Sequence, residues 1–364
     1  MYPPGMAIVA TQDLEGIRSK LTAWLARQLP AGSSGLEISD LKIPEGAGHS
    51  NTTLLFDARW SEGGSANERV DRNGGFVARV RPHGRGVFPE YDMRLQYRCM
   101  EILGAHTDIP VPRMLWFEED EHVLGGPFYV MEKLDGVVPA DNPPYAIAGW
   151  VAEATPEQQD ALWRRSIAVL ARIHTLDWKK LGFEFLDRPL NGPMGFEQQL
   201  AYYREYLGWA AGGRATGELD QTLVWLETHK PEDDRIVLNW GDSRISNMMY
   251  RDFTPIAVLD WEMACLGPPE ADVAWFVFMN EFLTNAIGLP GIAGFPDLAE
   301  TIAEYEKHAG FRLRDLHYFS VWAAFRFAVI MEAIETLMIH NGIDSPGIGA
   351  MARTALAKVR AGES

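Results

Sequence analysis

The sequence of 364 residues is poor in cysteine and has no long apolar run. Its two cysteines, Cys99 and Cys265, cannot form a disulfide framework or a four-thiolate zinc site, and they fit a reducing compartment. No stretch approaches eighteen uncharged apolar residues, which argues against a membrane-spanning helix. The first residues lack a basic stretch followed by an apolar one, so we expect no secretory signal and a cytoplasmic location.

Basic residues are also few, at 33 against 50 acidic residues, which gives a formal net charge of −17. Such a surface repels nucleic acids and anionic membranes, so we expect neither as a partner. The charge is compatible with a cationic small substrate, although acidity also serves solubility. Apolar residues at 47% and charged residues at 23% are ordinary for a globular protein of one large or two modest domains.

The first third of the chain predicts a β-rich lobe with flanking helices. An amphipathic pattern predicts a helix over 12–29, and a second pattern predicts one over 90–105. Strands are expected at 52–60 and 76–81, joined by a polar turn over 61–75, and further extended segments at 113–117 and 127–132. The stretch 135–144 is rich in proline and glycine and is interpreted as a linker. We therefore predict a first domain over 1–134 and a second over 135–364.

The second domain is predicted to be mainly helical. Thr155 to Gln158 form a capping box with proline at the first helical position, which starts a helix running past Ile173. Further helical patterns cover 196–210, 217–229, 269–283, 297–308, 313–340 and 346–360. One β-rich island, 235–261, interrupts them. Within it, strand-like residues 248–250 and 256–259 flank a turn over 251–255.

This island carries three residues suited to chemistry. If its hairpin is centred between Phe253 and Thr254, Asn247 and Asp260 face each other at the open end. An amide oxygen and a carboxylate are hard ligands that suit Mg²⁺. Asp242 precedes Asn247 by five residues, where a carboxylate could accept a proton from a substrate hydroxyl. An Asp and an Asn at this spacing more often cap local backbone, so the combination with Asp260 carries the interpretation.

The motif Gly241-Asp242-x4-Asn247 followed by Asp260-Trp261-Glu262 resembles the aminoglycoside phosphotransferase family, and the resemblance extends over roughly 40–280. It implies a two-lobed α+β protein-kinase-like fold that transfers the γ-phosphoryl group of ATP or GTP to a hydroxyl of a small molecule. By this resemblance Asp242 is the catalytic base, and Asn247 and Asp260 hold Mg²⁺. Trp240 stands where the family usually has histidine, which predicts altered packing of the loop and retained catalysis.

The resemblance also implies nucleotide-binding residues in the first lobe. Arg79 stands where the family has its phosphate-binding lysine, with Arg81 as the alternative, and Gln96 lies near the expected partner acid. An Arg79–Gln96 hydrogen bond is one replacement for the usual ion pair, and a different pairing is the other. The remaining candidates are a phosphate-covering loop and a hinge that receives the base, namely Gly46, Gly48, Ser50, Asn51 and Thr52, and Met131, Glu132, Lys133 and Leu134.

Two further residues resemble structural positions of the family. His174 lies on a helix among core residues and is interpreted as a buried, hydrogen-bonded histidine. Asp272 resembles the buried aspartate that braces the catalytic loop from the following helix, although an acid in a first helical turn is also favoured by the helix dipole.

The acceptor is left open by the sequence. Acidic residues near the island, Glu262, Glu270 and Glu281, could hold an ammonium group as in antibiotic kinases. The aromatic residues of 275–282 instead suit a large, partly apolar acceptor such as a macrolide, a sterol-like alcohol or a hydroxyacyl thioester. The residues of these motifs resemble those of the family's subgroup that is found beside acyl-CoA dehydrogenases.

Two other classes of function stay open. Trp240, Arg79 and Gln96 depart from the family pattern and would suit a nucleotide-binding regulator with little transfer activity, against which the presence of Asp242, Asn247 and Asp260 argues. The helix over 313–340 is apolar around much of its girth, which would suit an interaction protein but better suits a core helix. The oligomeric state is not predicted.

Overall fold

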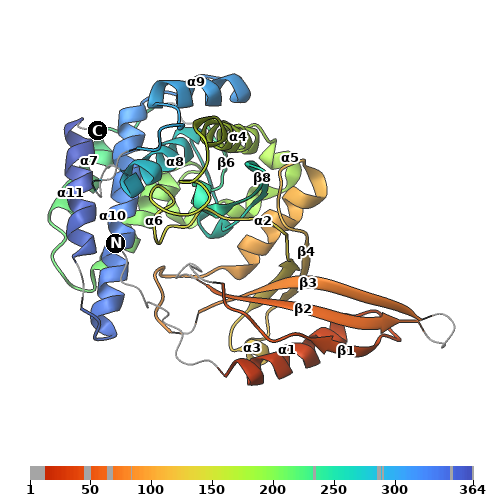
Figure 1. Ribbon diagram of the computed structural model, residues 1–364. Coiled ribbons are helices and arrows are strands. Elements are labelled where there is room, and N and C mark those ends of the chain that lie inside the picture. The colour runs from red at the N-terminus through yellow and green to blue at the C-terminus, as the bar shows by residue number, and fades with distance from the viewer. Residues whose placement is uncertain are drawn as a thin grey trace.

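Five strands form one antiparallel sheet with the order β1-β2-β3-β5-β4. The computed structural model describes residues 13–44, 51–63, 69–82, 84–232, 235–284, 288, 291–344 and 347–362. The strands are β1 (Ser34–Ile38), β2 (Thr52–Glu62), β3 (Val70–Val80), β4 (Met114–Glu118) and β5 (Phe128–Glu132). In Figure 1 the sheet lies to one side of the helices, and β2 and β3 extend beyond the other elements.

Helix α1 (Leu14–Gln28) covers one face of this sheet. Asp13 caps it by accepting from the backbone N–H of Gly16 at 2.9 Å, and Pro30 follows its end. Its buried Trp24 packs on Phe128 and donates its indole N–H to Glu118 at 2.7 Å. The short helix α3 (Glu121–Leu124) lies beside it. The helix predicted over 12–29 is therefore confirmed, whereas β1 and α3 were not predicted.

The predicted turn over 61–75 is too long, because both strands continue into this range and end only at Glu62 and Val70. Residues 52–62 pair with 70–80 without interruption, and Glu62 faces Val70. Polar side chains stabilise this outer part: Arg72 pairs with Glu62 at 3.1 Å, and Ser61 donates to Asp71 at 2.7 Å. No face of the outer ladder is fully buried, so the alternation of apolar residues that marks a strand is missing there.

Helix α2 (Met93–His106) packs near the other face of the sheet and connects it to the second half of the chain. Asp92 caps it by accepting from the N–H of Leu95 at 2.8 Å. The buried residues of α2 share one hydrophobic cluster with Tyr129 and Met131 of β5 and with Trp240 and Trp261 of the second half. The core therefore runs continuously between the two halves.

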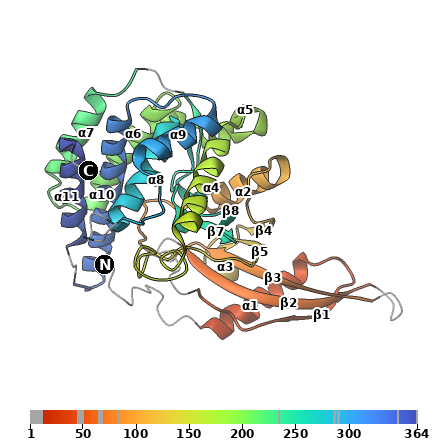
Figure 2. The same cartoon turned by 45° about the horizontal axis from the view of Figure 1, so that its top comes forward.

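The second half is helical, as predicted (Figures 1 and 2). Its helices are α4 (Pro156–His174), α5 (Trp178–Leu181), α6 (Phe196–Ala211), α7 (Glu218–Thr228), α8 (Pro269–Thr284), α9 (Leu298–Ala309), α10 (Leu316–His340) and α11 (Ile348–Ala361). The capping box at Thr155 and Gln158 is present. Eighteen residues of α10 are buried against α6, α7, α8 and α11, which confirms it as a core helix.

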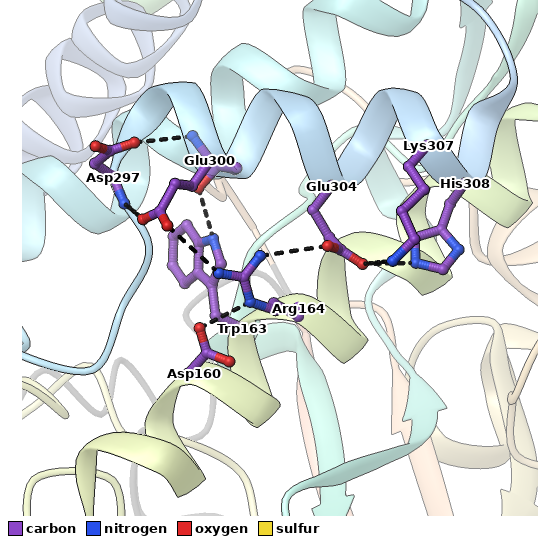
Figure 3. A network of polar contacts seen from close by, with 9 residues as sticks. Asp160, Trp163, Arg164, Asp297, Glu300, Glu304, Lys307 and His308 are labelled. Atoms are coloured by element: carbon purple, nitrogen blue, oxygen red, sulfur yellow. Dashed lines mark hydrogen bonds and ion pairs between the residues drawn. The ribbon is translucent and has the colours of Figure 1, made fainter.

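Polar contacts fix α9 across α4 (Figure 3). The buried indole of Trp163 donates to the hydroxyl of Thr301 at 2.9 Å. Beside it, Arg164 bonds to Asp160 of its own helix at 2.8 Å and to Glu304 of α9 at 3.3 Å. This network lies on the outer side of the helical lobe and serves its assembly.

Four short strands bring the predicted β island together. Strand β6 (Val237–Asn239) pairs with β9 (Cys265–Gly267), and β7 (Met248–Arg251) pairs with β8 (Thr254–Val258). Backbone bonds in both directions also join Val137 to Tyr250, so the segment after β5 is attached to this island. The boundary between 134 and 135 stays a prediction.

Both cysteines are free thiols, as the composition predicted. Burial raises the pKa of the Cys265 thiol to about 12 and raises the pKa of Cys99 further. None of the helices in the described ranges combines the length and apolarity needed to cross a bilayer.

Candidate active site

The β7–β8 hairpin places two of the predicted site residues at its open end. Its turn is Asp252-Phe253, and both residues have positive φ, 48° and 56°. This turn lies one residue before the predicted centre, which alone would shift each partner by two positions, and a bulge between Met249 and Tyr250 restores one. Asn247 therefore lies opposite Leu259, whose N–H donates to the carbonyl of Asn247 at 2.9 Å. The predicted direct pairing of Asn247 with Asp260 is therefore wrong by one residue. Asp260 follows immediately, at a left-handed position with φ 59°.

Asp242 lies in the loop between β6 and the short 3₁₀ turn Ile245–Asn247, and it is 8% exposed. Three side chains donate to its carboxylate. Trp275 Nε1 donates to Oδ1 at 2.8 Å, while Asn247 Nδ2 and Arg244 Nε donate to Oδ2 at 2.6 and 3.2 Å. Charge-assisted bonds of this kind hold the carboxylate in one orientation.

Asp272 braces this loop from α8, as the sequence predicted. Its fully buried carboxylate accepts the backbone N–H groups of Trp240 and Gly241 at 2.6 and 2.9 Å. His174 Nε2 lies 3.2 Å from the same carboxylate, and its Nδ1 lies 2.6 Å from the hydroxyl of Tyr305. His174 is thus the buried, hydrogen-bonded histidine expected, and it acts through Asp272.

Trp240, which stands where the family usually has histidine, is packed inside this loop. Its indole is fully buried, donates to the carbonyl of Leu259 at 2.8 Å and packs near Trp261. The indole therefore connects the loop of Asp242 to the residue before Asp260. Gly241 has φ 92°, and a Cβ there would lie 2.0 Å from the carbonyl oxygen of Met263, so only glycine fits.

Arg79 reaches this site from β3. Its guanidinium lies 3.4 Å from Asp260, and both side chains are largely buried. Burial alone would lower the pKa of Arg79, but the negative charges of Asp260 and Glu262 outweigh burial and raise it. Its buried Nε has no hydrogen-bond partner among the described residues. Arg81, the alternative, instead pairs with Glu121 at 2.7 Å.

The proposed hydrogen bond between Arg79 and Gln96 is not formed. The fully buried Gln96 accepts from the hydroxyl of Tyr129 at 3.1 Å, and its Nε2 lies 3.9 Å from the sulfur of Met93. The second possibility raised by the sequence therefore holds: Arg79 pairs with Asp260.

Of the predicted phosphate-covering loop, Gly46, Gly48 and Ser50 lie outside the described residues. Asn51 is buried, and its Nδ2 donates to Glu262 at 3.0 Å, which connects the entry of β2 to the segment of Asp260. Thr52 begins β2 opposite Val80.

The hinge prediction concerned Met131 to Leu134. Met131 lies within β5 between Val77 and Met114. The N–H groups of Glu132 and Lys133 already donate to the carbonyls of Arg113 and Gly75 at 3.0 and 2.9 Å. Within the described part of the chain, the Leu134 N–H makes no backbone hydrogen bond, so among these residues it is the backbone donor left for a nucleotide base.

Three residues near Asp242 were missed by the sequence analysis. Arg244 bonds to Asp242 and forms an ion pair with Asp141, which belongs to the segment interpreted as a linker. Trp275 was considered only as one of the aromatic residues of 275–282, without a role at Asp242. Arg326 of α10 is buried, donates to the carbonyl of Gly241 at 2.8 Å and lies 4.6 Å from the ring of Trp275. A lone arginine in an otherwise apolar helix was the signal available.

The three acidic residues considered for an ammonium group differ in surroundings. Glu262 accepts from Asn51, and Glu270 accepts the N–H of Arg314 at 3.1 Å. Burial raises the pKa of Glu281, with no other cause acting on it. Among these three carboxylates, Glu281 is therefore the one whose charged form is destabilised in the folded protein by burial alone.

We expect Glu281→Gln to raise the melting temperature at pH 7–8 by about 1–3 °C. The raised pKa means that folding stability is lost as the pH rises from the unfolded-state pKa through the folded-state pKa. The amide removes that loss, so the gain should fade towards pH 4. Thermal melts across this range test the prediction, with Glu205→Gln as control, because Glu205 of α6 is exposed. A variant that melts lower than the wild type at pH 8 would show that the charge is stabilising.

Comparisons with known proteins show the family of this chain. The model of the phosphotransferase enzyme family matches residues 61–311. Acyl-CoA dehydrogenase family member 10 of Mus musculus is 26% identical over 268 residues, covering 71% of this chain and 24% of the relative. The chain thus spans about a quarter of that relative's length.

Solved structures share the fold. A structure described as a putative aminoglycoside phosphotransferase from Ralstonia eutropha superposes with a TM-score of 0.67 at 23% identity, covering 94% of this chain and 96% of the other. A choline kinase from Streptococcus pneumoniae superposes with a TM-score of 0.59 at 11% identity, covering 96% and 98%. The predicted two-lobed α+β kinase-like fold is confirmed, and the chain belongs to the phosphotransferase enzyme family.

Proposed function

We propose that this protein is a small-molecule kinase that transfers the γ-phosphoryl group of ATP or GTP to a hydroxyl of its acceptor. The observation that carries the proposal is the meeting of Asp242, Asn247 and Asp260 around the loop braced by Asp272, with Arg79 reaching in from the sheet. Membership of the phosphotransferase family supports it. In such reactions catalysis is mainly positioning and neutralisation of charge.

Asp242 is proposed as the general base. Its three donors fix the orientation of this largely buried carboxylate. In that orientation the carboxylate can accept the proton of a bound hydroxyl and direct the hydroxyl oxygen towards the phosphoryl group. Asp272 and Arg326 form hydrogen bonds with the backbone of this loop and hold it in place. The loop therefore does not need to reorganise during the reaction.

Asn247 and Asp260 fit a magnesium ion. The amide nitrogen of Asn247 is used by Asp242, which leaves its amide oxygen as the end that can meet a cation. Asp260 adds a carboxylate held next to it by the Leu259–Asn247 backbone bond. One or two protein oxygens together with nucleotide phosphate oxygens are the usual ligands of Mg²⁺. When bound, the ion would neutralise phosphate charge.

Arg79 is proposed to bind phosphate oxygens. Its Nε is buried without a partner, and a buried donor of this kind is satisfied when an acceptor arrives. The guanidinium keeps its charge at any physiological pH, so it can replace the family lysine. Leu134 and the loop that contains Gly46, Gly48 and Ser50 complete the proposed nucleotide site.

For the acceptor, we propose a hydroxyacyl thioester ahead of an aminoglycoside or choline. The support is the relative whose printed name is acyl-CoA dehydrogenase family member 10, to which the chain is similar over 71% of its length. We also propose that this protein is located in the cytoplasm.

A thermal titration with ATP and GTP, with and without Mg²⁺, tests the nucleotide site. The proposal predicts a Mg²⁺-dependent stabilisation of about 2.7 kcal/mol at a nucleotide concentration one hundred times the dissociation constant. Transfer to the three acceptor classes is then measured with the preferred nucleotide. The absence of any shift at millimolar nucleotide would contradict the proposal and favour a kinase-like protein with a degenerate nucleotide site.

A further inference from the structure

The hydrogen bonds to the two carboxylate oxygens of Asp242, one of them from Trp275, indicate how the proposed base is oriented. The two oxygens differ in their partners: Oδ2 accepts from both Asn247 and Arg244, whereas among the described residues Oδ1 accepts from Trp275 alone. A carboxylate oxygen has two lone pairs in the plane, so Oδ2 is saturated and Oδ1 keeps one free position. Asp242 is 8% exposed, so the residue is not completely sealed, and Oδ1 is the oxygen with a position to offer a ligand.

We infer that Oδ1 of Asp242 is the atom that receives the acceptor's proton, and that Trp275 is the positioning residue that holds Oδ1 in place. The inference rests on the proposed kinase function. In the step, the hydroxyl O–H bond breaks and its proton passes to Oδ1. The hydroxyl oxygen bonds to the γ-phosphorus as the bond to the bridging oxygen breaks, and the nucleoside diphosphate leaves with that electron pair.

The surroundings of Trp275 show how it is held. Its ring is 2% exposed, and the guanidinium of Arg326 lies 4.6 Å from the ring centroid. The same guanidinium donates to the carbonyl of Gly241 at 2.8 Å, and its Nε donates to the hydroxyl of Tyr203 at 3.2 Å. Arg326 thus fixes the indole and the residue before Asp242 as one unit, so the N–H of Trp275 points at Oδ1 before any substrate binds.

The chain offers a matched control for this indole. Trp322 lies in the same hydrophobic cluster and is fully buried, but its Nε1 has no hydrogen-bond partner among the described residues. Phenylalanine at either position keeps an aromatic ring and removes an indole N–H. Only at position 275 does that N–H reach the proposed base.

We expect Trp275→Phe to lower kcat for phosphoryl transfer by about 10- to 100-fold, the range found when a group that orients an active-site ligand is removed. The KM for nucleotide should change less than twofold, because within the described residues the polar and ring contacts of Trp275 are with Asp242, Arg326, Phe278 and Phe327, none of which is proposed to bind nucleotide. Trp322→Phe should leave both constants within about twofold. A Trp275→Phe variant with the kcat of the wild type would overturn the inference.

The indole N–H resonances in ¹⁵N-labelled protein give a second readout that does not need turnover. The resonance that disappears in Trp275→Phe should move upfield in Asp242→Asn, because a neutral amide is a weaker acceptor than a carboxylate. A resonance that stays in place would overturn the assignment of the hydrogen bond. If the wild type neither bound nucleotide nor transferred phosphate, the proposed function would fail and with it the proton-transfer role, while this resonance would still decide the positioning contact.

Discussion

Asp242→Asn will lower the rate of phosphoryl transfer by about 10²- to 10⁴-fold, the range that a general base contributes, and will leave nucleotide affinity within a few-fold of the wild type. The amide has nearly the shape of the carboxylate and keeps one acceptor oxygen, so either Trp275 or Arg244 keeps its acceptor while the other faces the NH2 group. What is lost is the site for the proton of the acceptor. Initial rates at saturating nucleotide and a binding isotherm measure the two effects separately.

The matched control is Asp252→Asn in the β7–β8 turn. Asp252 is exposed, and its positive φ of 48° is one that asparagine adopts readily, so fold and activity should be unchanged. Full transfer activity in Asp242→Asn would show that another group is the base. A parallel loss of activity and nucleotide affinity would show that Asp242 acts in binding.

Asp260→Asn will abolish the Mg²⁺-dependent part of nucleotide binding, so the stabilisation of about 2.7 kcal/mol expected at a hundred dissociation constants should vanish. It will also lower the free energy of unfolding without nucleotide, by about 3 kcal/mol at most, since the buried guanidinium of Arg79 loses its carboxylate. Asparagine tolerates the left-handed backbone at this position, so the backbone itself should add little.

Two variants separate these effects. Asp57→Asn removes a carboxylate that pairs with Lys133 at the surface, and it should change neither quantity by more than about 0.5 kcal/mol. Adding Arg79→Met to Asp260→Asn removes the unpaired charge and should restore stability while nucleotide binding stays weak. If Asp260→Asn kept a Mg²⁺-dependent shift of wild-type size, Asp260 would not be a ligand of the metal.

The sequence predicted the elements of the site better than their register. Asp242, Asn247 and Asp260 could be singled out because motif spacing, flanking strands and a resemblance agreed. The register depended on the turn, and the turn places Phe253 at a positive φ that bulky residues seldom adopt. A turn centred one residue later was therefore predicted, which by itself misplaces the partner of Asn247 by two positions. The bulge between Met249 and Tyr250, which was not predicted either, reduces the error to one position.

Contacts across the fold could not be read from periodicity. An apolar pattern shows that 316–340 is a buried helix, but it does not show that Arg326 reaches the carbonyl of Gly241 or lies over Trp275. Likewise, Arg79 and Gln96 could be placed on the right elements, yet the choice between pairing with each other and pairing elsewhere depended on how Asp260 enters from the second lobe. The polar outer strands were missed because alternation of burial, which identifies strands, is absent from them.

The central claim is that this protein moves a phosphoryl group to a small-molecule hydroxyl. A ³¹P NMR time course with Mg²⁺, the nucleotide that stabilises the protein and the panel of acceptors observes that event directly. We expect the γ-phosphorus signal to decrease as a phosphomonoester signal grows with one class of acceptor, and we expect neither change with Asp242→Asn. A nucleotide that stays intact with every acceptor, or yields inorganic phosphate alone, would contradict it.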